Sequence, residues 1–99
     1  MTVTAGPAAF RPKDVISRAL SAVVALHAGD GAEARAQIAD AQRMARTSPR
    51  RHRQIVELAA LVVAGNRERA AGLAFGHTAE FPQDGRLAAR ITRAWGTDT

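Results

Sequence analysis

The sequence predicts an all-α fold with two antiparallel helix hairpins and a C-terminal capping helix. Three observations support this prediction. Apolar residues recur with helical spacing in five segments, and the β-branched and aromatic residues that favour strands are sparse. Alanine, which has the highest helix propensity, makes up about half of the hydrophobic residues. Glycines, prolines and short polar residues stand where the predicted helices begin and end.

The first hairpin is predicted to begin near Pro12, which suits the first turn of a helix, and to turn at Gly29. The apolar face of its first helix consists of Ile16, Ala19, Leu20, Val23 and Leu26. Asp30 is the predicted N-cap of the second helix, with Glu33 placed as in a capping box. The second helix carries a narrow stripe of small and apolar residues, namely Ala34, Ile38, Ala41 and Ala45.

The second hairpin is predicted to begin with Ser48 as N-cap and Pro49 at the first helical position. The buried face of its first helix contains Ile55, Leu58, Ala59 and Val62. Gly65 ends that helix, and Asn66 caps a helix whose inner face holds Ala70, Leu73, Ala74 and His77. Gly72 and Gly76 each cost ~1 kcal/mol relative to alanine, so we expect a neighbouring backbone to pack closely against them.

A fifth helix is predicted after the break at Phe81 and Pro82, running from Asp84 as its cap to Trp95. Its apolar stripe consists of Leu87, Ile91 and Trp95. The chain then divides into three parts: a flexible arm at 1–10, a single helical domain at 11–95 and a flexible tail at 96–99. We expect the fifth helix to cap one end of the stack of hairpins.

The two hairpins are copies of one unit, set 36 residues apart. Gly29 aligns with Gly65, and Ala34 aligns with Ala70. A period in the mid-thirties with helix pairs is typical of tetratricopeptide arrays. The chain resembles such repeats, because Gly65, Ala70 and Pro82 fall where that repeat carries its turn glycine, its small inter-helix alanine and its terminal proline.

A narrower resemblance covers residues 25–91, which look like bacterial relatives of the tetratricopeptide repeat protein 38 family. The matching segments are AGDGAEAR at 28–35, SPRR at 48–51, LVVAG at 61–65 and EFPQD at 80–84. Members of that family often carry a glutamate and a histidine in the first turns of the third helix, where this chain has His52 and Ile55. The resemblance implies a helical-repeat fold and says almost nothing about function.

The composition argues against several classes of protein. The chain has no cysteine, which suits a cytoplasmic protein and excludes disulfides and thiol catalysis. Its longest uncharged apolar run, at 19–29, is shorter than the ~20 residues of a membrane span. We therefore expect a cytoplasmic protein that does not contact a membrane.

No group of residues in the sequence predicts catalysis, a metal site or a cofactor. The three histidines, at 27, 52 and 77, have no second ligand at metal-binding spacing on one helix face. His77 is interpreted as a partly buried packing residue, and Asp84 as a helix cap. No serine–histidine motif or phosphate-binding glycine loop is present, so we expect a protein that is not an enzyme.

The most informative polar feature is an arginine cluster in the turn at 43–53. It contains Arg43, Arg46, Arg50, Arg51 and Arg53, in a chain whose net charge is +5. One interpretation is a contact with phosphate or an acidic peptide near a helix N-terminus. The alternative is a solvated turn whose arginines pair with Asp40 and Glu57.

The function that the sequence favours is protein–protein interaction or an adaptor role. Two hairpins fall below the three or so repeats that usually make such an array self-sufficient, so exposed apolar surface should dock on a partner or on a second copy. Val15 and Val24 widen the apolar face of the first helix, which favours a homodimer through that face. Weak binding of nucleic acid or another polyanion through the turn at 43–53 is the alternative, and no cofactor is expected.

Overall fold

A computed structural model describes residues 12–93, and every regular element in this range is helical. No strand occurs among these residues, so the all-α prediction is confirmed. In chain order the elements are α1 (Pro12–His27), α2 (Gly31–Ala45), α3 (Arg50–Val63), α4 (Arg67–Glu80), the 3₁₀ turn η1 (Pro82–Asp84) and α5 (Gly85–Thr92). Phe10, Trp95 and the expected terminal segments 1–10 and 96–99 lie outside the described residues.

The turns of the two hairpins have the same hydrogen-bonding pattern. Gly29 and Gly65 both adopt the left-handed backbone conformation, with φ of 87° and 80°. In each turn the glycine amide donates to the carbonyl three residues earlier, and the next amide donates to the carbonyl five residues earlier. These are the two bonds of a Schellman motif, which satisfies the last carbonyls of a helix. The residue after each glycine then caps the next helix: Asp30 accepts from the Glu33 amide, and Asn66 accepts from the Arg69 amide.

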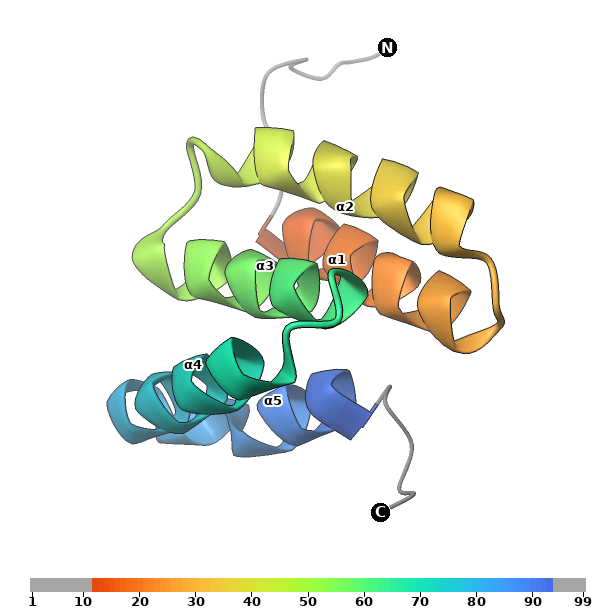
Figure 1. Cartoon of the computed structure of the whole chain (residues 1–99). Helices are drawn as coiled ribbons and strands as arrows, with labels where there is room; N and C mark the ends of the chain where they lie inside the picture. The colour runs from red at the N-terminus through yellow and green to blue at the C-terminus, as the bar shows by residue number, and fades with distance from the viewer. Residues whose placement is uncertain (1–11, 94–99) are drawn as a thin grey trace, which may run out of the picture.

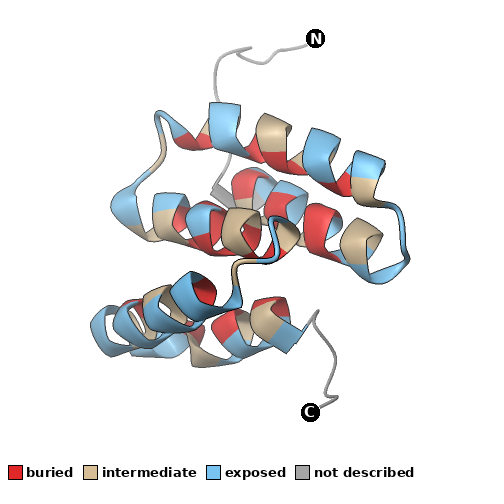
Figure 2. Ribbon diagram, viewed as in Figure 1, coloured by how far each residue is buried: buried red, intermediate tan, exposed pale blue. Residues whose placement is uncertain are grey.

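Helix α3 is the centre of the fold. It packs against α1 and α2 on one side and against α4 and α5 on the other (Figure 1). Buried residues line the faces that these helices turn toward one another, whereas the outer face of α2 is exposed (Figure 2). The predicted inner stripe of α2 is confirmed, and α3 buries its whole predicted face together with His52 and Val56.

The buried face of α1 differs from the predicted one. It consists of Val15, Ala19, Ala22 and Val23, while Ile16, Leu20 and Leu26 are only partly buried. The apolar residues of α1 occupy more than one face of the helix, so their spacing alone does not predict which face is buried. As a result, Leu20 and the exposed Val24 lie at the edge of the core.

Two local predictions are wrong. Pro49, and not Ser48, is the N-cap of α3, because the Ser48 hydroxyl donates to the carbonyl of Met44 at the end of α2. Gly72 and Gly76 have no close neighbour, since a Cβ added at either position would meet no atom within 4 Å. No helix in the described part of the chain packs on that face of α4, so close packing does not explain these two glycines.

Candidate functional site

The five arginines of the turn at 43–53 do not form one free basic patch. Four of them have partners within the chain: Arg43 pairs with Asp40, Arg50 with Glu80, Arg51 with Asp84, and Arg53 donates to the carbonyl of Ser48. The predicted ion pair of an arginine with Asp40 is confirmed. No ion pair between an arginine and Glu57 is found among the described residues. Much of the local positive charge is therefore neutralised, and polyanion binding through this turn stays a prediction.

Arg51 belongs to a polar network that joins α3 to the junction of α4 and α5. Its Nε and Nη2 atoms donate to the two carboxylate oxygens of Asp84, at 2.7 and 2.5 Å. The Nε2 atom of His77 lies 2.7 Å from Asp84 Oδ2. The Gln54 side-chain amide is oriented so that its oxygen accepts from Arg50 and its nitrogen donates to His77 Nδ1, at 2.7 Å. His77 in turn has Nε2 free to donate to Asp84.

The charges of this network are mutually stabilised. Hydrogen bonds from Arg51 hold the pKa of Asp84 below its usual range, against the opposing effect of burial, and His77 contributes in the same direction. The same hydrogen bond raises the pKa of Arg51. Asp84 is therefore ionised and paired at neutral pH.

Two interpretations from the sequence are corrected by this network. Asp84 precedes α5 but makes no capping hydrogen bond, because its carboxylate points at Arg51 and His77 instead. His77 was predicted to be a partly buried packing residue, whereas it is almost fully buried and has hydrogen-bond partners on both ring nitrogens. The side chains of His77 and Asp84 are only 1% and 3% exposed, so the network lies inside the fold, where its hydrogen bonds connect the α4–α5 junction to α3.

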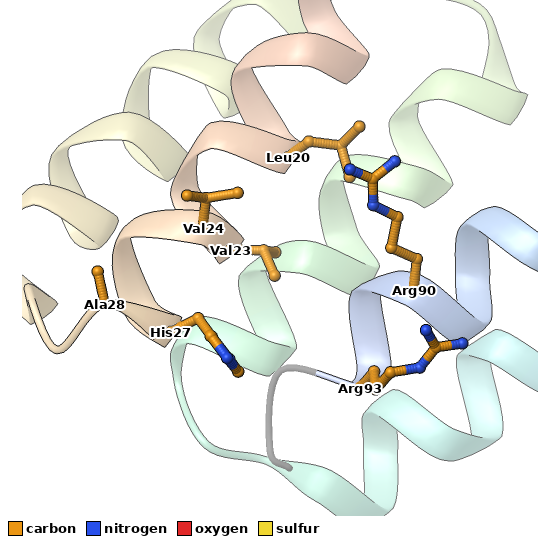
Figure 3. A pocket seen from close by; sticks show the side chains of 7 residues that line it. All are labelled: Leu20, Val23, Val24, His27, Ala28, Arg90 and Arg93. Carbon is orange, nitrogen blue, oxygen red and sulfur yellow. The ribbon is translucent and has the colours of Figure 1, made fainter.

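A groove with a largely apolar surface lies between α1 and α5. Its volume is about 410 Å³, and its lining residues are Leu20, Val23, Val24, His27, Ala28, Arg90 and Arg93. The α1 side is apolar apart from His27, and Val24 is 62% exposed there. The α5 side contributes two exposed arginines, and Figure 3 shows the Arg90 side chain extending toward Leu20. No carboxylate of residues 12–93 lines this groove.

The groove follows from the way the helices pack. Helix α1 packs on α2 and α3, and α5 packs on α3 and α4, but α1 and α5 do not pack closely on each other. Leu20 and Val24 lie at the edge of α1 that faces the resulting space (Figure 3). The apolar excess on α1 was a signal of this surface in the sequence, whereas nothing there indicated Arg90 and Arg93, which come from the other end of the chain.

Comparison with known proteins does not identify a family. No protein-family model matches the chain, and searches of curated proteins and of solved structures found no match. Ala34 and Ala70 are fully buried at equivalent points of the two hairpins, and Pro82 follows the end of α4. The tetratricopeptide resemblance stays a prediction beside these observations. No helix in residues 12–93 is long and apolar enough to cross a membrane.

Proposed function

We propose that this chain is a protein-interaction module of tetratricopeptide-like helical type and that it binds its partner through the groove between α1 and α5. The observation that carries the proposal is the open apolar wall of that groove. Val24 is 62% exposed beside Leu20 and Val23, and no other element in the described range covers it. Val24 is one of two large hydrophobic residues that the described chain leaves exposed, the other being Phe75 on α4.

The composition of the groove suits a protein partner. Burying apolar surface contributes about 25 cal/mol per Å², so covering the α1 wall would stabilise a complex. Arginine is enriched at protein interfaces, because its long stem packs on apolar atoms while its guanidinium pairs at the rim. Arg90 is placed in this way, because its side chain extends toward Leu20, and Arg93 also lines the α5 side of the groove.

Two other surfaces support alternative functions less well. The arginine turn at 43–53 is largely occupied by contacts within the chain. The His77–Asp84 pair is buried and engaged on both sides. A protein partner at the groove, whether another protein or a second copy of this chain, is therefore the function best supported.

Site-specific photo-cross-linking in the native host tests the proposal. A photoreactive amino acid replaces Val24 in the groove or, as a matched control, Ala36, which is exposed on the outer face of α2. We expect a discrete cross-linked protein product from position 24 that position 36 does not give. A product at twice the chain mass of 10.5 kDa would identify a second copy as the partner. The same products from both positions, or none from position 24, would contradict the proposal.

A further inference from the structure

We infer that the groove accepts an amphipathic helix of a partner protein that carries acidic side chains beside its apolar face. This inference rests on the proposed function, because it names the partner of the same groove. Three features of the described residues support it, namely the shape of the apolar wall, the unpaired charges on the opposite wall, and the poor fit of other occupants.

The first feature is the shape of the α1 wall. Leu20, Val24 and Ala28 follow one another at four-residue intervals, with Val23 and His27 beside them. Residues at this spacing form a ridge on a helix, and such ridges pack into the grooves of a second helix. The ridge is about 12 Å long, at 1.5 Å per residue, which matches about two turns of a docked helix. Both walls rest on α3 without packing closely on each other, which leaves the ridge of α1 uncovered on this side within residues 12–93.

The second feature is the charge on the α5 wall. Arg90 and Arg93 are exposed, and neither has a hydrogen-bond or ion-pair partner for its side chain within residues 12–93. This sets them apart from Arg50 and Arg51, which are paired. They stand at positions i and i+3, with Arg93 directly after the last residue of α5, so they lie about one helical turn apart. Two carboxylates one turn apart on the docked helix would pair with them by charge-assisted hydrogen bonds.

The third feature is that this wall disfavours the other occupants. A second copy in a two-fold contact centred on the groove would bring its own Arg90 and Arg93 into the same interface. The lining residues among 12–93 include no Asp or Glu that could neutralise these four arginines. A nucleic acid would satisfy the arginines with phosphates but would leave the apolar ridge of Leu20 and Val24 uncovered. An acidic amphipathic helix would cover the apolar α1 wall and pair with the arginines of the α5 wall.

A displayed library of helical peptides about 12 residues long, randomised on every face, tests the inference. The full chain selects binders, which are then measured as synthetic peptides against the unaltered chain and four variants. These variants are Val24→Glu, the double variant Arg90→Glu/Arg93→Glu, Ala36→Glu, and Arg86→Glu, which is exposed on α5 outside the groove lining. Circular dichroism checks that each variant remains folded.

We expect the enriched peptides to carry apolar residues at helical spacing with two Asp or Glu residues one turn apart. Their affinity should fall at least about tenfold in the Arg90→Glu/Arg93→Glu variant and remain near the original value in Arg86→Glu. Peptides in which those acids are replaced by lysine should bind the double variant better than the unaltered chain.

The outcomes separate this inference from the function on which it rests. Peptides that lose binding in Val24→Glu, but bind the Arg90→Glu/Arg93→Glu variant unchanged, would overturn the acidic partner and leave the groove as a binding surface. If the selected peptides bind Val24→Glu with unchanged affinity, or if no binder is selected, the inference is overturned. A second copy of the chain found at position 24 by cross-linking would also overturn the acidic partner, while it would support the interaction role of the groove.

Discussion

The carboxylate of Asp84 and the imidazole of His77 lie 2.7 Å apart at the buried junction of α3, α4 and α5. Asp84 also receives two hydrogen bonds from Arg51 on α3. One side chain in the short turn between α4 and α5 thus connects that turn to two helices. The position of α5, and therefore of the arginine wall of the groove, depends on this junction.

Replacing Asp84 with asparagine should lower the free energy of unfolding by about 2–4 kcal/mol, because it removes a buried carboxylate that is hydrogen-bonded to both Arg51 and His77. Denaturation in urea, followed by far-UV circular dichroism, measures the effect. Asp40→Asn is the control, since Asp40 forms ion pairs with exposed Arg18 and Arg43 and should contribute less than about 1 kcal/mol. Equal losses in the two variants would contradict the role assigned to the buried network.

The stability of the chain should fall in two steps as the pH decreases. Burial, followed by the charge of Arg51, lowers the pKa of His52, so the unfolded chain binds a proton more readily than the folded chain below pH ~6.5. The stability that depends on neutral His52 is therefore complete above pH ~6.5 and declines below it. Asp84 follows at lower pH: its pKa is lowered by Arg51, so its contribution is complete above pH ~3.9 and is lost as the pH falls through its folded pKa.

Urea titrations at a series of pH values separate the two steps. His52→Leu should remove the decline that begins near pH ~6.5 and retain the acid step, whereas Asp84→Asn should flatten the acid step. A His52→Leu variant whose stability depends on pH as steeply as that of the unaltered chain would show that His52 does not act in this way.

Ala34→Leu and Ala70→Leu should each destabilise the fold by about 1–3 kcal/mol through overpacking, because both alanines are fully buried at equivalent points of the two hairpins. The matched controls are Ala36→Leu and Ala71→Leu, which change exposed positions on the same helices. Urea midpoints compare the four variants. Midpoints that are unchanged for both buried positions would contradict the alignment of the two hairpins.

Gly72→Ala and Gly76→Ala should each stabilise the chain by about 0.5–1 kcal/mol, because alanine favours the helix and the added methyl group meets no atom. Gly65→Ala should act in the opposite direction by about 1–2 kcal/mol, since its φ of 80° is unfavourable for alanine. Thermal unfolding ranks the three variants. A loss of stability in Gly72→Ala and Gly76→Ala would show that these glycines have a packing role after all.

Local sequence signals predicted most of the fold. The glycine and cap pairs at 29–30 and 65–66 determined both hairpin turns, because a left-handed residue followed by a capping side chain leaves little choice of backbone. The stripe from Ala34 to Ala45 was narrow, so only one face of α2 could be buried. On α1 the apolar residues cover several faces, and the packed face is selected by α2 and α3 instead.

The polar network and the groove could be predicted only in part. Arg51 and Asp84 are 33 residues apart, and the partner of a charged residue at such a distance depends on how the helices are stacked. For the same reason the sequence alone does not distinguish Arg51 from the other arginines of the turn. The sequence indicates Val24 as part of an apolar excess on α1, but Arg90 and Arg93 line the same groove only through the packing of α5 on α3.

The groove is tested most directly by an NMR titration of the ¹⁵N-labelled chain with the tightest-binding peptide from the selection. We predict that the largest amide shifts occur at residues 20–28 and 90–93, while the amides on the outer face of α2 around Ala36 stay unchanged. If the largest shifts fall instead in the arginine turn at 43–53, and the groove residues do not move, the groove between α1 and α5 is not the binding surface.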